Sequence, residues 1–219
     1  MLLNLRFVTA SFCYRVLRKP QEEQALNRSS IFPSNEISTS QANAQKLAET
    51  PELSDADAKE FDYILLVDQS GSMANPSDKM EGKSRWEEAQ EFTEGFAPYA
   101  AQHDDDGITL IKFNSHAKIF DGVTADKVHE LFTKNQPSGS TNLAAALAEA
   151  VKKKNSSAKK AIVVVITDGT PDSQTAVEKV ICDASNALTK DEDEDLSFQF
   201  IQIGNDNGAE NSWSTWTTN

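Results

Sequence analysis

Two strongly apolar runs, each followed by an aspartate, constrain the fold of this chain more than any other feature. Residues 61–67 read FDYILLV and precede Asp68, and residues 161–167 read AIVVVIT and precede Asp168. A strand with one buried face alternates apolar and polar residues, whereas a continuous apolar strand is buried on both faces, as in a parallel sheet between two layers of helices. The two runs therefore predict central strands of such a sheet.

Helical and strand-like segments alternate around these runs. Helical spacing covers residues 85–99, after a capping-box pattern of Ser84 and Glu87, and further helices are predicted over 123–132, 142–154 and 173–188. Shorter strand patterns cover 108–113, 116–120 and 196–203, and the first two flank the polar pair Asn114-Ser115, which favours a β-hairpin. This alternation predicts an α/β fold with a Rossmann-like, doubly wound and mainly parallel sheet.

The first 58 residues differ in composition from the rest of the chain. Residues 1–20 contain four basic residues and no acid, and residues 27–50 are rich in Ser, Asn, Gln, Thr and Ala. Such a segment buries too little apolar surface to offset the entropy of ordering it, so we expect 1–58 to be a disordered extension, with a short acidic helix over 51–60. The basic start is compatible with an organelle-targeting segment or with an irregular start of the chain.

The charge and the cysteine content exclude several classes of protein. The chain has 34 acidic and 21 basic residues and a net charge of −13 at pH 7, which disfavours nucleic acid as a partner because an acidic surface repels phosphates. Cys13 and Cys182 are too few for a disulfide framework or a zinc cluster, and no apolar run reaches the roughly 18 residues of a membrane helix. We expect no transmembrane segment and, without a clear secretory signal, a cytoplasmic location.

Polar motifs stand where the apolar runs end. The first run continues into Asp68-Gln-Ser70-Gly-Ser72, the second into Asp168-Gly-Thr-Pro, and between them the loop PSGSTN opens a helix. Ligands of open α/β sheets bind beyond the carboxyl ends of the strands, where these motifs meet. Carboxylate and hydroxyl oxygens suit Mg²⁺ or Mn²⁺ rather than zinc or copper. The sequence therefore predicts a divalent metal site made of Asp68, Ser70, Ser72, Thr141 and Asp168.

With these positions the sequence resembles a von Willebrand factor type A domain that carries the metal-ion-dependent adhesion site of that family. The resemblance runs from about residue 61 to residue 204 and includes FDYILLVDQSGSM, SRWEEAQEF, PSGSTNL and VVVITDGTP. It implies a domain over 59–208 in which the hydroxyls of Ser70, Ser72 and Thr141 are metal ligands. It also implies that Asp68 and Asp168 bind the metal directly or through water, and that an acidic side chain of a partner protein fills the remaining coordination position.

The resemblance implies a non-catalytic, metal-dependent protein-binding module. With hydroxyls as direct ligands, the cation keeps enough charge to attract an Asp or Glu carboxylate of a partner, and loops 73–83, 137–140 and 170–173 should form the rim of the site. One alternative is a hydrolase or phosphotransferase that uses the same cation as a Lewis acid, although no general base or nucleophile is evident. Another is a truncated copy that no longer binds metal.

The end of the chain carries a further expectation. The resemblance implies a sheet ordered 3-2-1-4-5-6, but only residues 209–219 follow the last segment of the domain, too few for another helix and strand. We therefore expect the order 3-2-1-4-5, with the sixth strand missing and 196–203 at an edge. Phe198, Phe200 and Ile203 would be partly bare. Low stability, self-association through strand 196–203 or dependence on another chain would follow.

Overall fold

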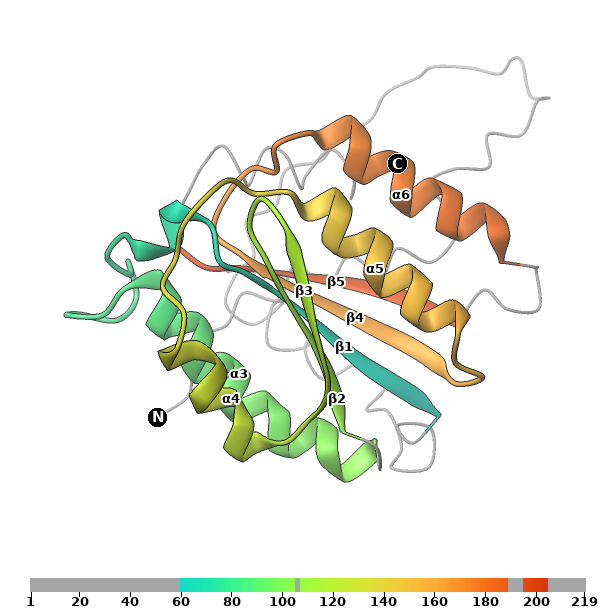
Figure 1. Ribbon diagram of the computed structural model, residues 1–219, viewed down its shortest axis with the longest axis horizontal. Coiled ribbons are helices and arrows are strands. Elements are labelled where there is room, and N and C mark those ends of the chain that lie inside the picture. Colours follow the sequence, from blue (N-terminus) through green and yellow to red (C-terminus); the bar gives the residue numbers. More distant parts are fainter. Residues whose placement is uncertain (1–59, 105–106, 189–194, 205–219) are drawn as a thin grey trace, which may run out of the picture.

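The structure is a computed structural model that describes residues 60–104, 107–188 and 195–204 (Figure 1). The expectations for residues 1–58, for the helix over 51–60 and for the tail over 209–219 lie outside the described residues. The elements in chain order are β1 (Phe61–Asp68), the 3-10 helix η1 (Gly71–Ala74), α3 (Arg85–His103), β2 (Ile108–Phe113), β3 (Ala117–Val123), α4 (Ala125–Thr133), α5 (Leu143–Asn155), β4 (Lys160–Thr167), α6 (Gln174–Ala187) and β5 (Leu196–Gln202).

The strands form one sheet in the order β3-β2-β1-β4-β5. Strand β1 pairs in parallel with β2 and β4, β4 pairs in parallel with β5, and β3 pairs antiparallel with β2 through the predicted hairpin. The mainly parallel α/β sheet and its order 3-2-1-4-5 are confirmed. The chain winds outward from β1 in both directions, which makes the β1–β4 junction the switch point of the topology.

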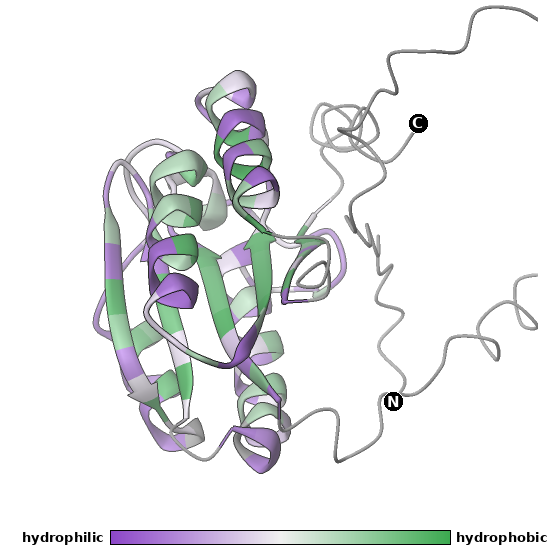
Figure 2. Cartoon of the chain, turned by 90° about the vertical axis from the view of Figure 1, so that its right-hand side faces the viewer, coloured by the Kyte–Doolittle hydropathy of each residue, from purple (hydrophilic) through white to green (hydrophobic). Residues whose placement is uncertain are grey.

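Helices cover both faces of the sheet, so the two central strands are apolar on both sides. Figure 1 shows α3 and α4 on one side and α5 and α6 on the other. On the α5–α6 side Ile64 and Leu66 of β1 pack in the same cluster as Leu147, whereas on the α3–α4 side Leu65 packs in a cluster with Trp86. Figure 2 shows the apolar strands enclosed by helices whose outer residues are hydrophilic.

A local sequence signal sets the start of α3, and an aromatic contact lies at its end. The side chain of Ser84 accepts a hydrogen bond from the Glu87 amide, and the Glu87 carboxylate accepts one from the Ser84 amide, so the predicted capping box is present. At the other end of the helix, His103 is only 8% exposed, and its ring packs edge-on against Tyr99 with centroids 4.9 Å apart. His103 is therefore a buried residue at the end of α3.

The residues of β5 are better covered than the sequence suggests. Phe198 and Phe200 are 3% and 6% exposed, because their side chains pack in one cluster with Val177 and Ile181 of α6. Ile203 is 1% exposed and belongs to the cluster on the opposite face. The expectation that Phe198, Phe200 and Ile203 are partly bare is wrong, since the phenylalanines face the helix that precedes β5 in the chain. In the described ranges, β5 pairs with β4 alone.

Across the described residues, no helix combines the length and the apolar character needed to cross a membrane.

Candidate metal centre

The ends of β1 and β4 bring the two predicted carboxylates to the same edge of the sheet. The strands pair in register up to Val67 and Ile166, so Asp68 at the end of β1 and Asp168 directly after β4 leave the sheet side by side. Their side chains are 0% and 1% exposed. Two buried carboxylates at a topological switch point form an anionic site that favours a cation.

Neutral hydrogen-bond donors hold the carboxylate of Asp68 in place. Its Oδ1 accepts a hydrogen bond of 2.8 Å from the Ser70 amide, and its Oδ2 accepts one of 2.5 Å from the Thr167 hydroxyl. Burial raises the pKa of Asp68 to about 6, because removal from water disfavours the charged form, and the hydrogen bonds from Thr167 and Ser70 offset only part of that effect. A bound cation would compensate the buried charge.

The hydroxyls of the first motif extend this site outward as a chain of oxygens. Ser70 Oγ lies 3.0 Å from Ser72 Oγ, and Ser72 Oγ donates a 2.8 Å hydrogen bond to Asp168 Oδ1. Adjacent oxygens around an octahedral Mg²⁺ with bonds of about 2.1 Å are separated by about 3 Å, so this spacing fits the ion. Ser70 is 2% exposed whereas Ser72 is exposed, which opens the oxygen chain to solvent at Ser72.

Backbone hydrogen bonds tie the loop that carries Thr141 to the first motif. The Gly71 amide donates to Gly139 O at 3.0 Å, and the Ser138 amide donates to Gln69 O at 2.8 Å, so the loop before α5 runs beside η1 (Figure 1). Gly139 has a φ of +83°, and a Cβ there would stand 2.8 Å from Ser115 Oγ. The tight loop therefore requires glycine. Thr141, which follows Gly139 in this loop, is 9% exposed.

Three further residues contact the predicted ligands and were not assigned from the sequence. Thr167 binds Asp68, Asp172 Oδ1 accepts a 2.9 Å hydrogen bond from the Thr141 amide, and Arg85 Nη1 donates a 2.8 Å bond to Asp168 Oδ2. Thr167 and Asp172 flank Asp168 within the ITDGTPD motif, so their position was a signal available in the sequence. Arg85 begins a helix far along the chain, and only the fold brings it to the site.

The predicted set fits a hard divalent cation by its chemistry. Hydrogen bonds connect Asp68, Ser70, Ser72 and Asp168, and Thr141 is joined to them through the backbone of its loop. In residues 60–104, 107–188 and 195–204, no group of three or more His, Cys, Asp or Glu side chains gathers in a way that could hold a metal. A metal at this edge of the sheet would thus depend on hydroxyl oxygens, which suits Mg²⁺ or Mn²⁺.

A doubly wound α/β domain with hydroxyl and carboxylate oxygens at its switch point defines the class of this protein. Residues 63–170 match the family model of the von Willebrand factor type A domain, and the chain contains such a domain. No curated protein sequence matches the chain.

Two solved structures are similar to this chain in fold. An aerotolerance-related membrane protein from Bacteroides fragilis is 18% identical, with a TM-score of 0.50 over 66% of this chain and 68% of that one. The manganese-loaded TRAP protein of Plasmodium vivax is 24% identical, with a TM-score of 0.50 over 68% of this chain and 60% of that one. The present chain therefore spans less than two thirds of the Plasmodium protein.

Proposed function

We propose that the domain is a non-catalytic protein-binding module that holds Mg²⁺ or Mn²⁺ and captures an Asp or Glu side chain of a partner protein. The metal would be held by Asp68, Ser70, Ser72, Thr141 and Asp168. The observation that carries the proposal is the oxygen chain from buried Asp168 through the exposed residue Ser72 to Ser70, with spacings of 2.8 and 3.0 Å.

The comparisons support the metal in the proposal. The Plasmodium vivax TRAP protein, which shares the fold, is manganese-loaded, and the oxygen ligands of the present chain suit the same ion. When bound, the cation would supply a positive charge for a carboxylate. The residues of this chain would fix its place, because Asp68 and Asp168 are buried at strand ends and Ser72, which is bonded to Asp168, is an exposed residue.

Metal binding is the first test. Titration of the full chain with Mn²⁺ in a calorimeter should give one site. Free metal at a concentration of 100 times its Kd should add about 2.7 kcal/mol to the free energy of unfolding. Asp68→Asn should abolish binding while the metal-free protein stays at least as stable, because the substitution removes a buried charge.

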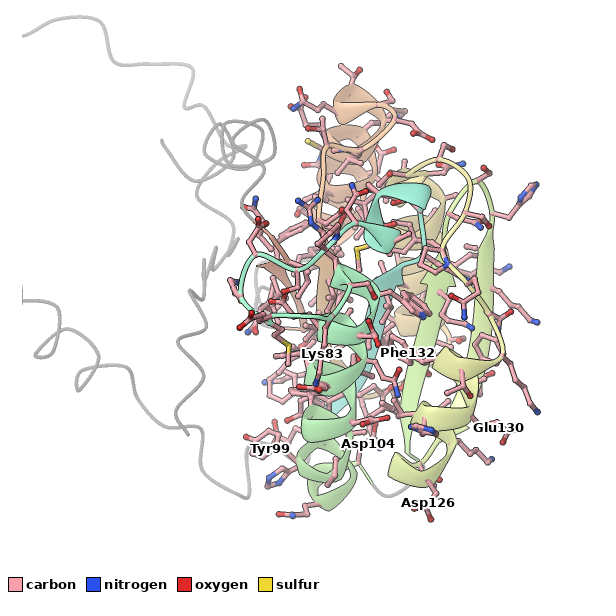
Figure 3. The ribbon with its side chains drawn as sticks, turned by 90° about the vertical axis from the view of Figure 1, so that its left-hand side faces the viewer. Lys83, Tyr99, Asp104, Asp126, Glu130 and Phe132 are labelled. Atoms are coloured by element: carbon pink, nitrogen blue, oxygen red, sulfur yellow. The ribbon has the colours of Figure 1, made fainter. Side chains whose placement is uncertain are left out.

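The matched control for this test is Asp126→Asn. Asp126 is exposed in the first turn of α4, at the end of the molecule opposite to η1 (Figure 3), so the substitution changes the net charge equally and leaves the site alone. If the Asp68 variant bound Mn²⁺ with wild-type affinity, the assignment of the metal site would be wrong.

Partner binding is the second test. Partners retained on the immobilised chain in Mg²⁺ should be released by EDTA, and replacement of a single partner Asp or Glu by its amide should prevent retention. Thr141→Ala should weaken retention with little effect on the metal-free fold. Retention that is equally strong in EDTA would contradict the mechanism for that partner. Phosphate-ester or carboxylate-ester hydrolysis that disappears with Asp68→Asn would instead establish an enzyme.

A further inference from the structure

The guanidinium of Arg85 places a permanent positive charge beside one of the two carboxylates of the candidate metal centre. Its Nη1 lies 2.8 Å from Asp168 Oδ2, and the two side chains are 16% and 1% exposed. The other oxygen of the same carboxylate, Oδ1, accepts the hydroxyl hydrogen of Ser72. Asp168 is thus shared between a proposed metal ligand on one side and a guanidinium on the other.

The position of the guanidinium is built into the fold. Arg85 is the first residue of α3, directly after the capping residue Ser84, and its amide donates a 2.9 Å hydrogen bond to Asn75 O. Asp78 Oδ2 lies 3.4 Å from Nη2. Beyond β5, Gly204 has a φ of +75°, and a Cβ there would stand 2.8 Å from the Arg85 Nε. Two separate loops therefore enclose the side chain.

We infer that Arg85 is a built-in counter-charge that keeps a bound cation attractive to a partner carboxylate. The inference rests on the proposed function. Asp68 and Asp168 together carry enough negative charge to neutralise a divalent ion, and a neutralised ion attracts a further carboxylate only weakly. Because Arg85 is fixed against Asp168, the metal, the two buried carboxylates and the guanidinium sum to one net positive charge. Asp78 also pairs with Arg85, but its side chain is exposed, so water and salt screen most of its charge from the metal. Arg85 therefore lowers the affinity for metal and raises the affinity of the loaded site for an acidic group.

The counter-charge role differs from the other roles that the contact allows in its effect on metal affinity. A residue that only positioned Asp168 as a ligand would strengthen metal binding, so its removal would weaken that binding. A residue that only anchored the start of α3 would change stability and leave metal affinity unchanged. A counter-charge opposes the cation, so its removal tightens metal binding while the metal-free protein loses stability, because Asp168 stays buried without its ion pair.

The experiment uses Mn²⁺ alone and compares charge-removing with charge-retaining variants of the full chain. Arg85→Met and Arg85→Gln remove the charge, and Gln can retain a hydrogen bond to Asp168 if Met prevents folding. Each should bind Mn²⁺ about tenfold more tightly than wild type in calorimetry at low salt. Arg85→Lys retains the charge and should stay within about threefold of wild type. Metal-free Arg85→Met should melt at a lower temperature.

A second readout measures the attraction for a carboxylate directly. Acetate that displaces water from bound Mn²⁺ lowers the relaxivity of solvent protons. Wild type and Arg85→Lys should respond at several-fold lower acetate concentration than Arg85→Gln.

The control variant is Lys83→Met, two residues before Arg85. Lys83 pairs with Glu91 on the exposed surface, so its removal changes the net charge of the chain by the same amount without touching Asp168. Its Mn²⁺ affinity should equal that of wild type, and an equal tightening would overturn the local role of Arg85.

The outcomes separate this inference from the proposed function. Wild type that binds Mn²⁺ while the charge-removing variants bind equally or more weakly would overturn the counter-charge role alone. Mn²⁺ binding that appears only when the charge is removed would support that role and contradict metal loading of the natural protein. Absence of binding by every variant would overturn both.

Discussion

Asp172 and Thr141 are joined by two reciprocal hydrogen bonds. The Thr141 amide donates to Asp172 Oδ1 at 2.9 Å, and the Asp172 amide donates to Thr141 O at 3.0 Å. The loop after β4 therefore fixes the backbone of the loop before α5 at the residue whose hydroxyl is a proposed ligand. Asp172 is exposed and acidic, and its side chain acts on the site through Thr141 rather than as one of the five proposed ligands.

The first prediction concerns this pair. Asp172→Ala should weaken Mn²⁺ binding by about tenfold, as expected when a residue that orients a ligand is removed. Asp172→Asn keeps an oxygen acceptor for the Thr141 amide and should restore most of the affinity. Calorimetric titration of both variants measures the difference. Equal affinity of Asp172→Ala and wild type would show that the loop before α5 holds Thr141 without help.

The second prediction concerns the start of α3, which carries Arg85 into the site. Ser84→Ala removes the N-cap acceptor of the Glu87 amide and should lower the free energy of unfolding by about 1 kcal/mol at pH 7, measured by urea denaturation. A loss well below this value would mean that packing alone fixes the helix start.

The capping box also has a pH dependence. The Ser84 amide and then its hydroxyl, as hydrogen-bond donors, lower the pKa of Glu87 from its ordinary value of 4.5. A carboxylate with a lowered pKa stabilises the fold fully above the ordinary pKa, and this contribution is lost as the pH falls through the lowered value. The difference between wild type and Ser84→Ala should therefore be constant near pH 7 and shrink below about pH 4.

The sequence predicted the sheet, and the meeting of Asp68 and Asp168 at one edge of it, because both depend on local patterns. The apolar runs before Asp68 and Asp168 are buried on both faces, and parallel pairing then brings their ends together. The covering of Phe200 could not be inferred in this way, since it depends on which face of β5 meets α6. The contact of Arg85 with Asp168 could not be predicted for a related reason. A helix start is a local signal, but the direction of the Arg85 side chain is set by tertiary packing.

The third prediction concerns Lys112, a buried cation in β2. Its side chain is 2% exposed, and its Nζ donates a 2.7 Å hydrogen bond to Leu131 O near the end of α4. Burial, and then the nearby charge of Lys118, lower the pKa of Lys112 to about 8. Lys112→Met should raise the free energy of unfolding by about 1 to 3 kcal/mol at pH 7, since the charged form is costly to bury and Asn135 also donates to Leu131 O.

The pH dependence tests the cause of that gain. Between about pH 8 and the ordinary pKa of 10.5, the folded protein has lost the Lys112 proton while the unfolded chain retains it, so the stability of wild type rises with pH. The advantage of Lys112→Met in urea denaturation should shrink over this range. Lys118→Met, which removes an exposed charge on the neighbouring strand, should show no comparable gain at pH 7. An advantage of Lys112→Met that is constant with pH would assign it to packing.

The last prediction decides between the two descriptions of the β5 face. Phe200 is 6% exposed in the cluster that includes Ile181 and Val177 of α6, so Phe200→Ala should lower the free energy of unfolding by about 3 to 4 kcal/mol through lost burial and a residual cavity. Gln199→Ala, one position earlier on the opposite face of the strand, is half-buried and should cost far less. Urea denaturation of both variants measures the contrast. A cost below about 1 kcal/mol for Phe200→Ala would mean that α6 leaves this face open in solution, as the sequence pattern alone predicts.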